Sequence, residues 1–200
     1  MEFDLARKSR PIVILPYQDR WRDEYLEVAR GLREWAGEEI RRVDHIGSTA
    51  VPGLGAKDVI DVQITVADLD RAESLVDRLV SGGYRERGSF RYDTFFGMSE
   101  TDVELRKLYL REPEGLRRTH IHVREDGRFN QRYALLFRDY LRRSTEGRTA
   151  YEVFKSRAAQ IFPESIDGYL FMKEPVLHLV YEAAQRWADQ IDWRPGDDAD

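Results

Sequence analysis

The sequence predicts an α+β (mixed α/β) fold, with a sheet core, flanking helices and a C-terminal helical layer. Three observations predict it. Val59 to Val66 is rich in β-branched residues, as central strands are. Apolar residues recur at helical spacing before it, between positions 19 and 37. After Gly127 the pattern stays helical to the end of the chain. We expect one domain over residues 11–190, with flexible tails at 1–10 and 193–200.

The first half of the chain begins with Ile12–Leu15, which lies between two prolines and fits an edge strand or an anchored arm. Asp19 is a candidate N-cap for a helix that ends at Gly37. The apolar face of this helix, which we expect to be buried, consists of Trp21, Tyr25, Val28, Leu32 and Trp35. A strand over 40–46 follows, and then a loop over 49–57. In the strand over 59–66, alternation places Ile60, Val62 and Ile64 opposite Asp61 and Gln63.

In the second half of the chain, apolar and polar residues alternate less regularly before the pattern becomes helical. Asp68 is placed to cap a helix that closes at Gly82. Four further strands are expected over 84–87, 90–96, 103–110 and 119–124, followed by helices near 129–144, 148–162 and 173–190.

Composition excludes several classes of function. The 200-residue chain has no cysteine, so disulfides, thiolate nucleophiles and zinc–thiolate sites are absent. The formal net charge of −5 argues against a general affinity for nucleic acid or anionic membranes. No apolar run approaches the roughly 20 residues that span a bilayer, and the start does not resemble a signal peptide. We expect a soluble, cytoplasmic protein.

One segment has the composition of a phosphate-binding loop: it runs from His45 through Gly47, Ser48 and Thr49. Glycine lets backbone N–H groups approach an anion, and the two hydroxyls add donors. Lys57 could neutralise a phosphate, and Asp61 on the next strand could hold a cation that bridges to it. His45 could orient the loop through a hydrogen bond. The plainer interpretation is a turn that links two strands.

A second group of candidates is the pair His120 and His122. Two residues apart on a strand, they point to one face of the sheet. Beside Asp61 they could bind a metal or perform acid–base chemistry, contact a phosphate or substrate, or form structural hydrogen bonds only. Arg118, directly before this strand, is a candidate phosphate contact.

The string HIGSTAVPGLGAKDVIDVQI resembles the signature of the GrpB family, whose domain is also fused to some dephospho-CoA kinases. THIHV at 119–123 resembles the family's His-x-His strand, and the sequence at 137–142 resembles the helix after it. Two Tyr-x-x-x-Lys pairs, Tyr151 with Lys155 and Tyr169 with Lys173, match as well. The resemblance covers roughly residues 11–190.

The family is similar to the nucleotidyltransferase superfamily, and this resemblance implies a matching site. Gly47 and Ser48 fall where that superfamily contacts phosphates, and Asp61 falls on the first acidic position of its magnesium-binding Asp-x-Asp. The second acidic position is Gln63, a weaker ligand for a hard divalent ion. Glu104 is a candidate replacement. The resemblance also favours Lys155 or Lys173 reaching the cleft.

Three functional hypotheses follow. The first is an enzyme that binds a nucleoside triphosphate and a divalent metal, Mg²⁺ or Mn²⁺ or a transition metal held by the histidines, and acts on an unknown acceptor other than nucleic acid. In it, Asp61, His120 and His122 are the catalytic and metal-binding candidates. The second is a binding module in which Gln63 has ended turnover. The third is an accessory protein that acts on a partner, as the fusions suggest.

Overall fold

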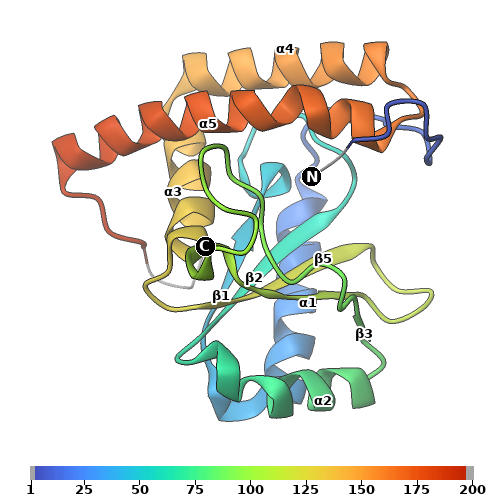
Figure 1. Ribbon diagram of the computed structural model, residues 1–200, viewed down its shortest axis with the longest axis vertical. Helices are drawn as coiled ribbons and strands as arrows, with labels where there is room; N and C mark the ends of the chain where they lie inside the picture. The colour runs from blue at the N-terminus through green and yellow to red at the C-terminus, as the bar shows by residue number, and fades with distance from the viewer. Residues whose placement is uncertain (1–2, 197–200) are drawn as a thin grey trace.

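A computed structural model describes residues 3–196 of the chain. Its centre is a five-stranded mixed sheet with the strand order β1-β2-β5-β4-β3 (Figure 1). The strands are β1 (Ile40–Ile46), β2 (Ile60–Val66), β3 (Arg85–Glu86), β4 (Leu108–Arg111) and β5 (Thr119–Glu125). The helices are α1 (Arg20–Ala36), α2 (Glu73–Ser81), α3 (Phe129–Arg143), α4 (Thr145–Ile161) and α5 (Ile166–Ile191). The predicted α+β architecture is confirmed.

The register of the three central strands decides which polar residues meet. β1 and β2 pair antiparallel, so that Ile46 faces Asp61. β2 and β5 pair parallel, with Asp61 opposite His120 and Gln63 opposite His122. Because alternate residues of a strand share a face, these four polar residues belong to one face of the sheet.

The other face of the sheet is apolar, and α1 and α2 cover it. Its strand residues include Val43, Val62 and Ile121, which are fully buried. They form the largest hydrophobic cluster together with apolar residues of the two helices, Trp21, Tyr25 and Leu75 among them. Burial of this apolar surface contributes about 25 cal/mol of free energy per Å², and it is the main force that holds the two helices against the sheet.

Three helices, α3, α4 and α5, lie on the polar side of the sheet, where α3 contacts β1 and β5. The buried Arg138 of α3 donates to His45 O at 3.0 Å and lies 3.6 Å from the Asp44 carboxylate. α4 and α5 run side by side across one end of the molecule, whereas α2 lies at the other end (Figure 1). No helix in the described part of the chain is long and apolar enough to cross a membrane.

Several predicted elements differ from the structure. Residues 90–96 form a loop, in which only Tyr92 makes an isolated bridge, to Arg106. The predicted strand over 103–110 is a short 3₁₀ helix at Val103–Leu105 followed by β4, because Asp102 accepts from Glu104 N and bends the chain. The last helix begins at Ile166 instead of 173, with the Ser165 side chain as its cap.

Trp35, which we expected in the core, is 46% exposed. It lies at the end of α1, where its ring covers Gly82 after α2, so closely that a Cβ at Gly82 would stand 2.6 Å from the ring. The spacing of apolar residues predicted the correct helix. Trp35 is half exposed because it packs on Gly82, at the edge of the core.

The two segments that we expected to be loose tails are partly packed. Ser9 N donates to Glu164 O at 2.6 Å, and Ser9 Oγ accepts from Ile166 N at 3.0 Å. The following arm makes a single bridge, Leu15 to Ala56, instead of a strand. At the other end Trp193 is buried and donates to Asp139 Oδ2 at 3.2 Å. Residues 1–2 and 197–200 of the expected tails lie outside the described residues.

Candidate functional site

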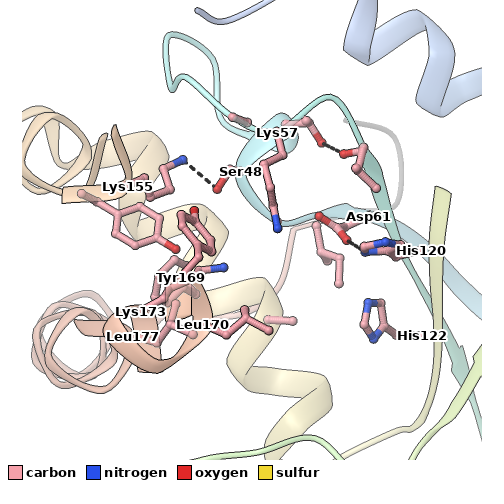
Figure 2. Close-up of a pocket in the computed structure, with 18 of the residues that line it drawn as sticks. Ser48, Lys57, Asp61, His120, His122, Lys155, Tyr169, Leu170, Lys173 and Leu177 are labelled. Atoms are coloured by element: carbon pink, nitrogen blue, oxygen red, sulfur yellow. Dashed lines mark hydrogen bonds and ion pairs between the residues drawn. The ribbon is translucent and has the colours of Figure 1, made fainter. Parts of the chain in front are cut away.

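A cavity of about 440 Å³ lies between the polar face of the sheet and the helices α3, α4 and α5. Residues from the end of β1, the starts of β2 and β5, and all three helices line it. Figure 2 shows Asp61 and His120 on one side, Lys155 and Lys173 on the other, and Lys57 between them. We call it the Gly-Ser cavity, after the Gly47-Ser48 bend in its wall. Of the predicted site residues, those that line it are Gly47, Ser48, Thr49, Lys57, Asp61, Arg118, His120, His122, Lys155 and Lys173.

The bend after β1 requires glycine for two reasons. Gly47 has φ of +72°, a conformation that side chains with a Cβ rarely adopt. In addition, a Cβ at this position would lie 2.5 Å from Asp61 Oδ2. The missing side chain therefore makes room for the Asp61 carboxylate beside the loop.

Asp61 and His120 form a carboxylate–imidazole pair across the parallel strands, with 3.0 Å between Asp61 Oδ1 and His120 Nδ1. Burial by itself would raise the pKa of Asp61. The hydrogen bond and charge of His120 outweigh burial and hold this pKa well below its usual range. Asp61 is therefore ionised at neutral pH, and the pairing leaves His120 Nε2 unbound to Asp61.

His122 completes a cluster of three potential metal ligands, whose donor atoms lie within 4.8 Å of one another. Its Nδ1 is buried and has no hydrogen-bond partner in the described residues. Burial lowers the pKa of His122 well below its usual range, and the charges of Lys107 and Arg124 lower it further. A neutral imidazole with an unused nitrogen is the form that binds metals.

This donor set fits a transition metal better than magnesium. Two imidazoles and one carboxylate suit ions such as Mn²⁺ or Zn²⁺, whereas Mg²⁺ prefers a shell made of oxygen. Asp61 is the only carboxylate that lines the cavity in the part of the chain that the structure describes.

Lysines concentrate at the opposite wall. The chain has only five lysines among its 32 basic residues, and Lys57, Lys155 and Lys173 all line the Gly-Ser cavity. Lys155 donates to Ser48 Oγ at 3.0 Å and to Gly55 O at 2.5 Å. This pairing links α4 to the Gly-Ser bend and presents a row of ammonium groups to the cavity.

Burial and the charge of neighbouring lysines lower the pKa values of Lys57 and Lys155. Burial lowers the pKa of Lys57 to about 8, with a further lowering by the charge of Lys173. Burial likewise lowers the pKa of Lys155 to about 7, again with a contribution from Lys173. Together with Arg118 and Arg124, the three lysines face a single carboxylate among the described lining residues, so the cavity attracts an anion with several charges.

Of the two arginines before β5, one lines the cavity and the other does not. Arg118 is exposed there, and no carboxylate of residues 3–196 lies within 4 Å of its guanidinium. Arg117 instead donates to Glu24 at 2.7 Å and Asp58 at 2.5 Å. Arg117 therefore anchors α1 to the loop before β2.

The remaining wall of the cavity is apolar and aromatic. It consists of Ile46, Ala56, Val59, Tyr133, Ala134, Phe137, Tyr151, Ile166, Tyr169, Leu170 and Leu177. The Lys57 ammonium lies 4.9 Å from the centre of the Tyr169 ring. A ligand with both a polyanionic part and a flat apolar part fits this combination of walls.

His45 lies outside this cavity, on the other face of β1. Because neighbouring residues of a strand point to opposite sides, Ile46 faces the cavity and His45 does not. Its ring stacks on Tyr25 at 4.6 Å, and its Nε2 lies 3.0 Å from Thr49 Oγ1. Thr49 donates its own proton to Val59 O, so His45 Nε2 is the donor of this pair. The expected orienting hydrogen bond exists, but it comes from outside the cavity.

Gln63 also lies outside the cavity, although it shares a face with Asp61. It is fully buried, with Oε1 accepting from Arg124 at 2.6 Å and Nε2 donating to Gln131 O at 3.1 Å. Both ends of the amide are occupied, because α3 covers this part of the sheet. Gln63 therefore holds α3 to the sheet and is not available as a metal ligand.

Glu104 does not replace the missing carboxylate. Its Oε2 accepts from Phe129 N at 2.8 Å and its Oε1 from Arg128 at 2.9 Å. It caps the start of α3, outside the cavity.

The sequence reasoning missed a charged group behind His122. Asp93 accepts from Lys107 at 2.5 Å and from Arg124 at 2.9 Å. Arg124 lines the cavity, and alternation from His120 and His122 could have pointed to it. Nothing in the sequence indicated Asp93, because it lies in the loop over 90–96 that we expected to be a strand.

Comparisons with known proteins agree with this architecture. The family model named GrpB protein matches residues 11–183. A crystal structure of the conserved protein GrpB from Enterococcus faecalis has a TM-score of 0.73 and 31% identity, covering 88% of this chain and 99% of that chain. A Cid1 poly(U) polymerase bound to MgATP has a TM-score of 0.50 at 12% identity, covering 80% of this chain and 50% of that one. This last likeness concerns the fold alone.

Curated relatives extend beyond the region they share with this chain. A dephospho-CoA kinase of Mycolicibacterium paratuberculosis is 34% identical over 199 residues, which cover 92% of this chain and 49% of that protein. UPF0157 protein YqkA of Bacillus subtilis is 30% identical over 180 residues, covering 90% of this chain and 49% of that protein. The chain thus spans about half the length of these relatives. Because the family model matches most of the chain, and a solved GrpB structure shares its fold over nearly its whole length, the protein belongs to the GrpB family and has a nucleotidyltransferase-like fold.

Proposed function

We propose that the protein is a nucleotidyltransferase-like enzyme that binds a nucleoside triphosphate and a divalent metal in the Gly-Ser cavity. One observation carries the proposal. Three of the chain's five lysines line the cavity that contains the Gly47-Ser48 bend, and Asp61, His120 and His122 line it too. The lysines and Arg118 match the charge of a triphosphate, and the aromatic wall suits a base.

In this function the Gly-Ser wall orients the phosphates. Ser48 Oγ accepts from Lys155, and its own proton can be donated to a phosphate oxygen or to the neighbouring Tyr151. Lys57, Lys173 and Arg118 neutralise charge on the phosphates. Positioning and neutralisation of charge supply most of the catalysis in reactions of this kind.

The transfer step is a substitution at the α-phosphorus. An acceptor oxygen forms a new P–O bond there, the bond from the α-phosphorus to the bridging oxygen breaks, and pyrophosphate leaves. The acceptor's proton passes to a water molecule, because Nε2, the one nitrogen of His120 that is not paired with Asp61, would hold the metal. Asp61, His120 and His122 are the residues that would hold the metal, which supplies charge neutralisation when bound.

Calorimetric titration tests this proposal. ATP, GTP, CTP and UTP are titrated in turn with MnCl₂ or MgCl₂ into the wild type and into Ser48→Ala, Asp61→Ala and Lys173→Ala. We expect at least one nucleotide to bind, and each variant to bind it at least tenfold more weakly. The matched control is Lys8→Ala, which removes an exposed lysine that pairs with Glu164 and does not line the cavity. No binding by any nucleotide, or equal binding by all variants, would overturn the proposal.

One observation favours a binding module as the second candidate. Within residues 3–196 a single carboxylate lines the cavity, and Gln63 is bonded to Arg124 and Gln131 instead. A module of this kind would bind the triphosphate but release no pyrophosphate. Incubation of the bound nucleotide with the protein, followed by an assay for pyrophosphate, separates the two candidates once an acceptor is supplied.

A further inference from the structure

The strand register extends the polar face of the sheet from the Gly-Ser cavity to the sheet's edge. His120 of β5 lies between two neighbours on this face, Asp61 of β2 on one side and Arg111 of β4 on the other. Arg111 in turn lies opposite Arg85 of β3, the edge strand. Neighbouring strands are about 4.8 Å apart, so this row runs about 14 Å from Asp61 to the edge. Figure 1 shows β3 apart from α4 and α5, so these two helices do not cover the edge.

A second row, beside the first, is aromatic. Tyr109 of β4 lies opposite His122, and the centres of their rings are 5.2 Å apart. Phe90 packs edge-on against Tyr109 at 5.5 Å and is 45% exposed. Arg87 N donates to Tyr109 O at 2.8 Å, and Arg87, two residues after Arg85, points to the same face. We use the name edge strip for Arg85, Arg87, Phe90, Tyr109 and Arg111.

The three arginines of the edge strip carry more charge than their ion pairs balance. The buried Glu112 accepts from Arg111 at 3.0 Å and lies 3.3 Å from Arg85. Arg87 is exposed and makes no ion pair with any described side chain. Glu86 stands between Arg85 and Arg87 in the sequence and therefore points to the opposite face of the sheet. Three arginines against one glutamate leave an excess of two positive charges on this face.

We propose that the edge strip binds the acceptor of the transfer reaction, and that this acceptor is a single strand of nucleic acid. The inference rests on the proposed function and names its second substrate. Arginines bind the phosphates of such a strand, and an exposed ring such as that of Phe90 stacks on any base. The net charge of −5 predicted an acceptor other than nucleic acid, because it averages over the whole chain and hides this local excess.

The edge strip is electrostatically continuous with the Gly-Ser cavity. Burial lowers the pKa of Arg118 in the cavity wall, and the charge of Arg111 lowers it further. The row of the strip ends at Asp61 and His120, which hold the metal in the proposed function. A strand bound along the row therefore brings its terminal hydroxyl to the cavity.

This hydroxyl supplies the acceptor oxygen of the transfer. Its oxygen forms the new bond to the α-phosphorus of the nucleoside triphosphate, and the bond from that phosphorus to the bridging oxygen breaks. Pyrophosphate leaves, the hydroxyl proton passes to water, and the strand becomes one nucleotide longer.

Fluorescence anisotropy with two labelled probes, oligoadenylate and oligodeoxyadenylate of about ten nucleotides, tests this inference. Each probe is titrated at several NaCl concentrations with the wild type, Arg87→Ser, Phe90→Ala and the double variant. Arg87→Lys and Phe90→Trp keep the charge and the ring, and so report on folding. The matched control is Arg30→Ser/Phe171→Ala, which removes an exposed arginine of α1 and a half-exposed ring of α5 that lie outside the edge strip and do not line the cavity.

We expect at least one probe to bind the wild type and the control, and the double variant to bind it roughly tenfold more weakly. Arg87→Ser should lower the slope of log affinity against log salt by about 0.7, since it removes one phosphate contact. Phe90→Ala should weaken binding without a change in that slope, and the two conservative variants should bind like the wild type. Binding of neither probe, or equal binding by the double variant and the control, would overturn the inference. Equal affinity of the wild type and Phe90→Ala would overturn it too, because a site for any polyanion needs no ring.

A second measurement separates this inference from the proposed function. Calorimetry of the nucleoside triphosphate with the double variant should give the wild-type affinity, because the edge strip does not contact the triphosphate. Triphosphate binding without probe binding would reject the acceptor alone, whereas loss of triphosphate binding by the wild type would reject the proposed function. Incubation of the bound probe with the triphosphate and MnCl₂ should yield a longer strand on a denaturing gel, and the probe that is extended identifies the sugar of the acceptor.

Discussion

Gly47 and Asp61 are in close contact, because the Asp61 carboxylate occupies the space that a side chain at position 47 would need. A Cβ at Gly47 would lie 2.5 Å from Asp61 Oδ2, and the backbone of Gly47 has φ of +72°. The carboxylate that pairs with His120 is thus held against the bend that, in the proposed function, contacts phosphate. A single substitution at position 47 should disturb both parts of the site.

We expect Gly47→Ala to destabilise the fold by about 2–3 kcal/mol, since it adds the positive-φ penalty of about 1–2 kcal/mol to the clash with Asp61. Urea unfolding measures this free energy. The control is Gly53→Ala, at φ of +78° and with the nearest side-chain atom 3.8 Å from a Cβ, which carries the backbone penalty without the clash. Equal losses for the two variants would mean that the Asp61 contact has no energetic weight.

The metal affinity should depend on the two histidines of β5, His120 and His122. We expect MnCl₂ to bind the wild type more tightly than MgCl₂, because imidazole nitrogens favour transition ions. His122→Ala should weaken Mn²⁺ binding at least tenfold, as measured by the electron paramagnetic resonance of free Mn²⁺. His178→Ala is the control, since His178 lies on α5 against Phe95 and does not line the Gly-Ser cavity. Tighter binding of Mg²⁺ than of Mn²⁺ would contradict this donor set.

The affinity for a triphosphate should fall as pH rises from 7.5 to 9. Lys57, with a pKa of about 8, and Lys155, with a pKa of about 7, are depressed by burial, so they lose their charge in or just below this range. A bound polyanion favours their protonated forms, so binding takes up protons there. Calorimetry in two buffers of different ionisation enthalpy counts those protons. Lys57→Met should bind more weakly and take up fewer protons, whereas an affinity independent of pH would argue against both lysines as contacts.

Replacing Gln63 with an acid should not create a metal site. Gln63→Asp is one methylene shorter and has no N–H to donate to Gln131 O, so we expect a loss of about 1–3 kcal/mol of stability. Gln63→Glu keeps the length and the partner Arg124, which lies 2.6 Å from Oε1, and should lose less. Thermal unfolding ranks the two variants. A gain of Mn²⁺ affinity in Gln63→Asp would show that this position reaches the cavity after all.

The sequence predicted the central architecture because local patterns there agree with the tertiary structure. The β-branched run that became β2 alternates apolar and polar residues, and so does β5; one face of each strand packs on α1 and α2. Glycine at position 47 marked the bend, and His120 and His122 were correctly placed on one face. The prediction of a strand over 90–96 was wrong because contacts between distant segments hold this part of the chain as a loop. Phe95 packs on Tyr133 of α3, and Phe90 packs on Tyr109 of β4.

By itself, then, the sequence determined the residue types of the site, the face of each strand on which they lie, and the family. Only the tertiary structure decided which of them meet. The parallel register of β2 and β5 joins Asp61 to His120, and the packing of α3 removes Gln63 from the cavity. Lys155 reaches Ser48 across 107 positions of sequence. The spacing of residues along one helix or strand determines the face to which their side chains point. Contacts between distant segments depend instead on how whole layers of the fold pack, which no local pattern encodes.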